Sequence, residues 1–381
     1  MEPSVRVRYE YNDNITLTTQ PHKSVNGNLI APKVELGSRA EAWQINGTAE
    51  ITRRRYPGES SLDRDDNTFK LASQYSIARD TWRLEGTRTL DSVLSEELSA
   101  DTGAVQVQKR RETHGVSPEW TRMLTDKTQM QLAYNLSDIS YVNGENVGLY
   151  DYRYSVASLR LSHQTSERSQ IFATAAYSAF HVPATGFDSV SRIFQAGVAR
   201  NFSETLQGSL MAGVRKTESL TQGGKPIYEP FFLGGLIQTG VTADTRREET
   251  SPTLNASLDK KFEKSSMNLT ATRSLDPSGS GGQVEQDSFD FRWNRPVTSR
   301  FQFKFNAYTL NSRTVEGNIS NNDRVYSYAE PGAYWQMSSE WVVNVSYRYT
   351  HTKRENEAKA ATANAVYLTL AYYPLKMSIS R

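Results

Sequence analysis

The segment from Asp287 to Asn311 reads DSFDFRWNRPVTSRFQFKFNAYTLN. In both halves of this segment, apolar and polar residues alternate, so that every second residue is apolar. Aromatic residues at positions 289, 291, 293, 301, 303 and 305 alternate with charged or amide residues. Successive side chains on a strand point to opposite faces of a sheet. The segment therefore predicts a β-hairpin with one aromatic face and one polar face.

The same alternation recurs along the whole chain without a second apolar layer. The 381 residues are 37% hydrophobic, and the mean hydropathy is -0.62. These values suit a polar soluble protein or a partly disordered chain. However, 20 Tyr, 14 Phe and 6 Trp at strand spacing argue against disorder. A transmembrane β-barrel reconciles the two observations, because only its lipid-facing residues need to be apolar.

Short turns and long polar loops alternate along the chain. We count one opening strand (Ser4 to Asn12), eight hairpins joined by short turns, and a closing strand (Ala363 to Tyr373). This gives about 18 strands, with 16 as the alternative count. The predicted fold is all-β, a transmembrane antiparallel up-and-down barrel with short periplasmic turns and long extracellular loops. We expect residues 1–381 to form a single barrel domain with both termini in the periplasm, and the opening Met1-Glu2-Pro3 to be a mature start without a signal peptide.

Several classes of protein do not fit this sequence. No uncharged apolar run approaches the roughly 18 residues of a membrane helix. Lys and Arg number 44 against 42 Asp and Glu, a net charge of +2 that gives no reason to expect nucleic acid as a partner. None of the five His stands at a metal-binding spacing, and no nucleophile or phosphate-binding motif occurs. We expect no enzymatic activity, no cofactor and no metal.

Charged residues inside the predicted strands lie on the faces opposite the aromatic residues. A charge facing hydrocarbon at the midplane of a barrel costs about 2–4 kcal/mol, so these residues are expected to face the lumen. Arg and Lys rings in pores select anions, so a mildly cationic lumen favours an anionic passenger. The alternative is that cross-strand salt bridges stiffen the wall without selecting anything. The predicted pore-lining residues are Arg6, Arg8, Lys33, Arg39, Arg54, Lys70, Arg83, Arg215, Arg292, Lys304, Arg348, Glu10, Glu35, Glu85 and Asp290.

The longest loop, residues 218–250, has an apolar, Gly-rich centre. Such a centre favours a loop that folds inward as a constriction or gate, with Tyr228, Phe231, Phe232 and Leu233 as gating residues. The alternative is a pair of strand extensions above the membrane. The short segment from Pro277 to Gly282 reads as a flexible loop tip.

Two short motifs carry a resemblance to a known family. Near the start stands Tyr9-Glu10-Tyr11-Asn12-Asp13-Asn14, and the last predicted strand is VYLTLAYYP, residues 366–374. Both resemble outer-membrane β-barrel proteins of exopolysaccharide loci, a porin-like family. The resemblance implies passage of a secreted polysaccharide through the outer membrane, with periplasmic export proteins as partners. The chain departs from most outer-membrane barrels by continuing from Leu375 to Arg381 after its last aromatic residue, so the last strand ends either near Tyr373 or near Ile379.

The expected function is a passive, monomeric outer-membrane channel that exports an exopolysaccharide. Its other partners would be outer-membrane lipid and lipopolysaccharide. A diffusion porin for sugars or anionic solutes is the first alternative, although no short acidic constriction loop typical of trimeric porins is found. A non-conducting adhesin or scaffold barrel, whose lumen would be filled by paired charges, is the second.

Overall fold

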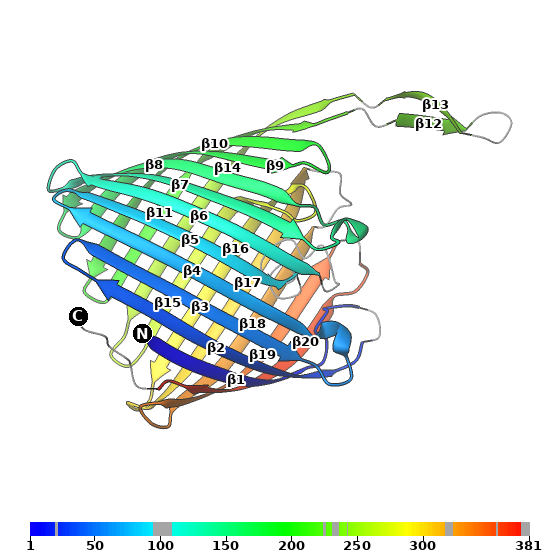
Figure 1. Cartoon of the computed structure of the whole chain (residues 1–381). Coiled ribbons are helices and arrows are strands. Elements are labelled where there is room, and N and C mark those ends of the chain that lie inside the picture. Colours follow the sequence, from blue (N-terminus) through cyan, green and yellow to red (C-terminus); the bar gives the residue numbers. More distant parts are fainter. Residues whose placement is uncertain are drawn as a thin grey trace.

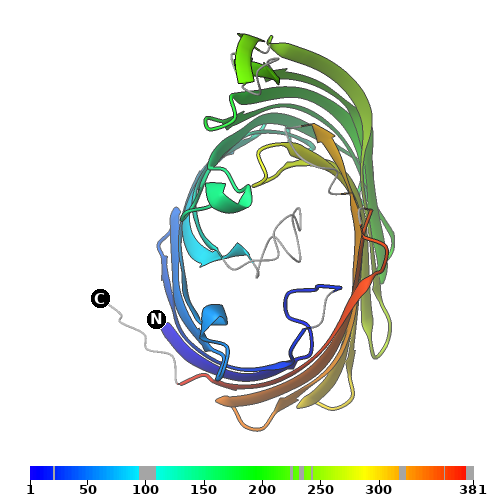
Figure 2. The same cartoon turned by 90° about the vertical axis from the view of Figure 1, so that its right-hand side faces the viewer.

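The computed structural model describes residues 1–19, 22–93, 109–223, 226–230, 236–241, 243–316, 323–355 and 357–374. Within these residues, 18 antiparallel strands form one closed sheet and two further strands form a separate hairpin (Figures 1 and 2). None of the described helices is long and apolar enough to cross a membrane. The barrel strands are β1 (Glu2–Asn12), β2 (Val25–Arg39), β3 (Trp43–Arg55), β4 (Arg64–Ile77), β5 (Asp80–Ser92), β6 (Arg110–Met123), β7 (Thr128–Tyr141), β8 (Tyr152–Ser166), β9 (Ser169–Val182), β10 (Phe187–Ser203), β11 (Leu206–Thr221), β14 (Thr245–Lys261), β15 (Ser266–Pro277), β16 (Gln283–Pro296), β17 (Phe301–Glu316), β18 (Arg324–Gln336), β19 (Trp341–Arg354) and β20 (Ala361–Tyr372).

Each barrel strand pairs with the next one along the chain, and β11 pairs with β14 across the separate hairpin. Pairing of β1 with β20, from Val5 opposite Tyr372 to Asn12 opposite Ala365, closes the barrel. Closure leaves no free sheet edge at this junction. The predicted fold class and the count of 18 strands are confirmed, and the last strand ends at Tyr372.

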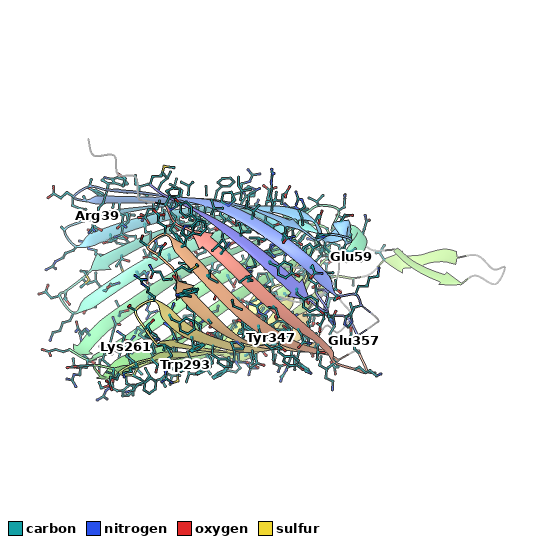
Figure 3. All side chains as sticks on the ribbon, turned by 90° about the horizontal axis from the view of Figure 1, so that it is seen from below. Arg39, Glu59, Lys261, Trp293, Tyr347 and Glu357 are labelled. Carbon is teal, nitrogen blue, oxygen red and sulfur yellow. The ribbon has the colours of Figure 1, made fainter. Side chains whose placement is uncertain are left out.

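The outer face of the barrel is an apolar band with aromatic borders. Val5, Val7 and Tyr9 on β1 are exposed, as are their counterparts on the other strands. All six Trp lie within three residues of the short-turn end of a strand. Figure 3 shows Arg39 and Lys261 at the short-turn end of the barrel and Glu59 and Glu357 at the opposite end. A border of aromatic residues beside an apolar band marks a lipid interface of an outer-membrane barrel, here the one at the short-turn end.

Outward-facing ion pairs lie beyond this band, toward the long loops. The guanidinium of Arg88 is 2.7 Å from the carboxylate of Glu112, and that of Arg153 is 2.6 Å from Asp138. The pair between Lys216 and Glu248 has an N–O distance of 2.8 Å. Charges of this kind suit the polar zone outside the hydrocarbon. The chain is therefore built to span an outer membrane, with the short turns, the start of β1 and the end of β20 on the periplasmic side.

The loop 218–250 does not fold into the lumen in its described part. The β11–β14 ladder continues as far as Thr221 opposite Thr245. Beyond it, β12 (Pro226–Pro230) and β13 (Leu236–Val241) pair with each other and project away from the barrel (Figure 1). A paired ladder carries the segment outward, so the expected inward fold is wrong and the strand-extension alternative is correct. Of the predicted gating residues, Tyr228 lies on β12, and Phe231, Phe232 and Leu233 lie outside the described residues.

Other loops do turn into the barrel. The helical turns η1 (Ser60–Leu62) and η2 (Glu145–Val147) and the loop after β1 lie inside the ring of strands in Figure 2. Two apolar clusters hold them. One contains Val93, Ile139, Tyr141, Leu149, Tyr152, Phe180, Val182 and Phe187. The other joins Leu17 of the β1–β2 loop to Leu310, Tyr326 and Ala363, with Leu62 of η1 packed against it.

The β15–β16 turn also folds inward, contrary to the expected flexible tip. From their short turn, β14 and β15 pair only as far as Leu254 opposite Arg273, so the end of β15 beyond Arg273 is not bonded to β14. Beyond it, Ser278 is fully buried, and the backbone N–H of Tyr150 donates to the carbonyl of Gly279 at 2.7 Å. The hydroxyl of Ser189 donates to the Gln283 side chain at 2.7 Å. Small side chains allow this turn to pack closely against the inner side of the wall.

Candidate functional site on the lumen wall

The strand registers place every predicted pore-lining residue on the inward face. Directly opposed residues in an antiparallel sheet point to the same side. Arg8 faces Leu29, Leu29 faces Arg54, and Arg54 faces Arg64, which sets three arginines in one row across four strands. The same reasoning applies to Lys33, Glu35, Arg39, Lys70, Arg83, Glu85, Arg215, Asp290, Arg292, Lys304, Arg348, Arg6 and Glu10.

Many of these inward charges are paired along the wall. The guanidinium of Arg6 lies 2.7 Å from Glu50, that of Arg83 lies 3.1 Å from Glu85, and that of Arg292 lies 2.8 Å from Asp290. Lys33 forms a salt bridge with Glu35. Arg215 lies 3.3 Å from Glu285, which stands beside the inward-folded β15–β16 turn. The salt-bridge alternative therefore describes a large part of the predicted set.

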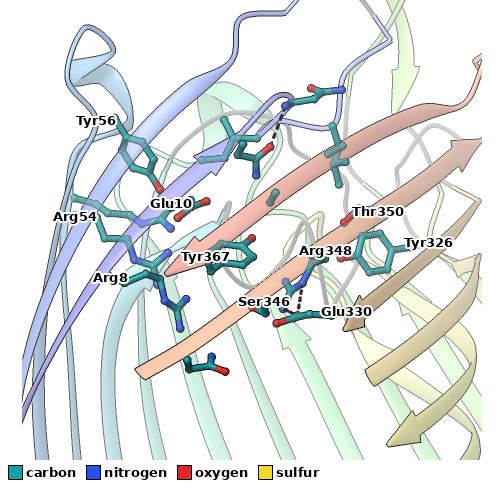
Figure 4. Close-up of a pocket in the computed structure, with 18 residues that line it drawn as sticks. Arg8, Glu10, Arg54, Tyr56, Tyr326, Glu330, Ser346, Arg348, Thr350 and Tyr367 are labelled. Carbon is teal, nitrogen blue, oxygen red and sulfur yellow. Dashed lines mark hydrogen bonds and ion pairs between the residues drawn. The ribbon is translucent and has the colours of Figure 1, made fainter. Parts of the chain in front are cut away.

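Four of the predicted residues, Arg8, Glu10, Arg54 and Arg348, come together around one cavity in the wall (Figure 4). The cavity encloses about 290 Å³ between β1, β3, β4 and β18–β20. We call it the wall pocket. Its remaining lining residues are Asn12, Asn14, Ile15, Leu17, Tyr56, Arg64, Tyr326, Glu330, Asn344, Ser346, Thr350, Ala363, Ala365 and Tyr367.

The arginines of the wall pocket differ in how they are held. The Nε of Arg348 donates to the carboxylate of Glu330 at 2.7 Å. The Nε of Arg8 donates to the hydroxyl of Thr369 at 3.1 Å. Buried Arg64 lies 3.5 Å from Asp66. Within the described residues, no carboxylate forms a salt bridge with Arg8 or Arg54. The positive charges of these two guanidinium groups are therefore not balanced by a paired carboxylate.

Tyrosine rings lie among the arginines. The guanidinium of Arg8 lies 5.3 Å from the centre of the Tyr367 ring, and that of Arg348 lies 5.7 Å from it. On its other side, Arg348 lies 4.8 Å from the ring of Tyr328. Contacts of this kind are cation–π interactions, which hold a guanidinium in place without neutralising its charge.

The loop after β1 forms a fixed roof over the wall pocket. Asn14 is only 1% exposed, and its backbone N–H donates to the side-chain oxygen of Asn12 at 2.9 Å. Its amide nitrogen donates to the carbonyls of Thr18 and Thr362, both at 2.9 Å. Leu17 adopts a φ of 49°, which is uncommon for a leucine and is held here by its packing in the second apolar cluster.

Tyr56, just after β3, closes another side of the pocket. Its ring lies over Gly27, where a Cβ would meet the ring at 2.6 Å, so only glycine permits this approach. Burial raises the pKa of the Tyr56 phenol, and the nearby carboxylate of Glu10 raises it further. The phenol therefore stays neutral at physiological pH.

Sequence reasoning missed part of this site. The inward residues Arg64, Tyr326, Glu330 and Tyr367 were not predicted, the two tyrosines because aromatic residues were assigned to the lipid face. The sequence did hold a signal, because Tyr367 alternates with the lipid-facing Val366 and Leu368 and so belongs to the opposite face. The register confirms this face, since Tyr367 pairs with inward Glu10. Within the described residues, no group of three or more His, Cys, Asp or Glu could hold a metal ion.

Comparisons with known proteins give similarity in architecture alone. No protein family and no curated protein matches the sequence. Among solved structures, the siderophore receptor PiuA from Acinetobacter baumannii is 9% identical, with 98% of this chain and 82% of that chain covered and a TM-score of 0.48. OccK5 (OpdH) from Pseudomonas aeruginosa is 8% identical, with 98% of each chain covered and a TM-score of 0.47. OccAB2 from Acinetobacter baumannii is 10% identical, with 98% and 97% covered and a TM-score of 0.47. By its own closed register and apolar outer band, this chain is an 18-stranded outer-membrane β-barrel.

Proposed function

We propose that the chain is a passive outer-membrane channel that prefers anionic, hydroxyl-rich solutes. The observation that carries the proposal is the pair of inward arginines, Arg8 and Arg54, without carboxylate partners in the described residues. Most other inward charges are paired and contribute little net field. Unpaired arginines that line an aqueous path attract anions and hold back cations.

The proposal covers two kinds of passenger. In the first case the passenger is a polymer, the exopolysaccharide whose export the resemblance implies. Periplasmic export proteins would then bind at the short-turn end of the barrel. A diffusion porin for sugars or anionic solutes is its small-molecule form. The volume of the wall pocket, about 290 Å³, lies at the lower end of the range for ligand sites. One small unit at a time fits such a pocket, whether it is a free solute or one residue of a polymer.

Reconstitution of the purified chain into planar bilayers tests this proposal. We expect discrete conductance steps, and a reversal potential in a KCl gradient that shows preference for chloride. The Arg8→Gln, Arg54→Gln double variant should reduce this preference, whereas Arg83→Gln, which removes a paired arginine, should change it less. A barrel that stays closed, or one that prefers cations, would contradict the channel and favour the scaffold alternative.

The two passengers are then separated by size. Liposome swelling with small sugars measures entry of free solutes. Block of the ionic current by a long acidic polysaccharide added on one side measures threading of a chain. Swelling without polymer block favours the porin, and polymer block without swelling favours export.

A further inference from the structure

We propose that the wall pocket binds a single uronic acid unit, a sugar ring that carries a carboxylate. This inference rests on the proposed channel function and names the chemistry of its passenger. The pocket combines an anchor for a carboxylate, an aromatic surface for a sugar ring, and polar side chains for hydroxyl groups (Figure 4).

The carboxylate anchor is formed by Arg8 and Arg54. They lie in one row on β1 and β3, with Leu29 of β2 between them. Neighbouring strands are about 4.8 Å apart, so the two backbones stand roughly 10 Å apart and long side chains can converge on one small group between them. Figure 4 shows both side chains directed toward the cavity. A planar guanidinium matches a carboxylate through two parallel hydrogen bonds.

The charge balance of the pocket leaves room for an anion. Its lining holds four arginines (Arg8, Arg54, Arg64 and Arg348) and two glutamates (Glu10 and Glu330). Glu330 is engaged by Arg348, and Arg64 is paired with Asp66, which lies outside the lining. Arg8 and Arg54 therefore remain against the single carboxylate of Glu10, to which no salt bridge occurs among the described residues. Clustered like charges are costly away from bulk water unless an opposite charge joins them. A bound carboxylate would reduce this excess.

A buried guanidinium atom points to the same conclusion. The Nε atom of Arg54 is buried and has no hydrogen-bond acceptor within the described residues, whereas the Nε atom of Arg64 already lies 3.5 Å from the carboxylate of Asp66. Buried polar groups in folded proteins are normally satisfied. Carboxylate and ring oxygens of a bound sugar would supply acceptors at this position.

The rest of the pocket suits a hydroxyl-rich ring better than a simple anion. Tyr367 is half-buried and is held between Arg8 and Arg348, so part of its ring faces the cavity. The amide of Asn344 and the hydroxyls of Ser346 and Thr350 line the same space. Pockets that orient a small ligand typically pair an aromatic surface with a few placed polar groups. Free phosphate could use the arginines but would leave these groups without a role.

Block of the open channel by defined sugars tests the inference. Galacturonate, galactose and inorganic phosphate are added in turn to the full chain in a planar bilayer. We expect concentration-dependent block by galacturonate, with galactose and phosphate much weaker. Charge-assisted hydrogen bonds contribute about 1.5–3 kcal/mol, so loss of one should weaken galacturonate block at least about tenfold.

Arg54→Lys is the decisive variant, because it keeps the charge but removes the planar fork. It should keep the preference for chloride and lose the galacturonate block. Tyr367→Leu should weaken block by galacturonate while leaving chloride preference unchanged. Arg83→Lys is the matched control, because Arg83 faces inward outside the pocket and is paired with Glu85. Galacturonate should block this variant as strongly as the parent chain.

Other outcomes separate the two proposals. A channel that prefers chloride but is not blocked by galacturonate overturns the uronate site and leaves the channel function standing. Equal block by phosphate and galacturonate also overturns it, because the ring contacts would then contribute nothing. Unchanged block in Arg54→Lys places the site elsewhere. Absence of any conductance in the parent chain overturns the channel function, and the inference with it.

Discussion

The inner surfaces of β1–β4 and β18–β20, here called the charged wall, contrast with those of β7–β10, the neutral wall. The charged wall presents the arginines, glutamates and tyrosines of the wall pocket. On the neutral wall, the described strands β7, β9 and β10 turn no Asp, Glu, Lys or Arg toward the lumen, by register. Their inward positions are filled by Ala, Ser, Thr, Asn, Gln and a few apolar residues.

The neutral wall is shaped for close packing. The guanidinium of Arg160 on β8 lies 3.9 Å from the centre of the Phe172 ring. The Phe172 ring in turn covers Gly197, where a Cβ would meet it at 2.5 Å. Side chains here lie flat against the sheet, and the apolar cluster around Phe180 holds η2 at the mouth. Both walls have an apolar outer face, because both contact lipid. They differ in the residues that face the lumen, where charged, polar and apolar side chains are all tolerated. Both walls hold inward loops, but only the charged wall carries unpaired inward arginines around a pocket.

The largest expected effect comes from removing a packed ring of the neutral wall. Phe180 is 2% exposed, and its ring centre lies 5.3 Å from Tyr152 and 5.9 Å from Phe187. Phe180→Ala should cost about 3–5 kcal/mol of unfolding free energy. On the charged wall, Tyr328→Ala should cost less, because Tyr328 is only half-buried. Urea unfolding of both variants in detergent measures the difference, and equal losses would break the distinction between a packing wall and a binding wall.

A smaller effect follows from placing one charge on either face of the neutral wall. Leu159 on β8 points outward and is 42% exposed to lipid, whereas its neighbour Ser158 points inward. Leu159→Arg should cost about 2–4 kcal/mol and reduce assembly into the outer membrane. Ser158→Arg should assemble normally and increase preference for chloride, since it adds an inward positive charge to the neutral wall. Membrane fractionation and reversal potentials provide the two measurements, and similar assembly of both variants would contradict the assigned faces.

Features of the two walls that depend on residues close in sequence could be predicted, whereas features that depend on residues far apart in sequence could not. Two-residue alternation is local, so it predicted the barrel, the strand count and the inward direction of residues such as Arg8 and Lys304. Inward loops depend on distant partners. Leu17 packs against Leu310 and Tyr326, about 300 residues away in the chain, and Ser189 bonds to Gln283. No local pattern reports such contacts, which is why the inward fold was expected in residues 218–250 and not in the loops that adopt it.

Of the wall pocket, only the four charged residues Arg8, Glu10, Arg54 and Arg348 were predicted. Tyr9 and Tyr347 face lipid, whereas Tyr326 and Tyr367 face the lumen, although all four are tyrosines in alternating strands. Residue type does not distinguish these positions. Only the register, which pairs Tyr367 with Glu10, assigns the ring to the inside.

The smallest expected effect concerns Tyr56 at the edge of the charged wall. Burial raises the pKa of its phenol above the usual value near 10. Below pH 10 the phenol is neutral in both folded and unfolded chains, so it adds no pH dependence to stability. Above pH 10 the unfolded chain ionises first, so stability falls as pH rises, by about 1.4 kcal/mol for each unit of pKa difference at most. Comparison of urea midpoints for the parent chain and Tyr56→Phe between pH 7 and 11 measures this.

Tyr56→Phe should differ in slope only above pH 10, because phenylalanine has no proton to lose. Between pH 6 and 9 both forms should show the same preference for chloride, since the arginines of the pocket stay charged throughout and the phenol stays neutral. A step in chloride preference within this range that disappears in Tyr56→Phe would mean that the phenol ionises beside Arg54. The charged wall would then carry a titrating group, and its contrast with the neutral wall would depend on pH.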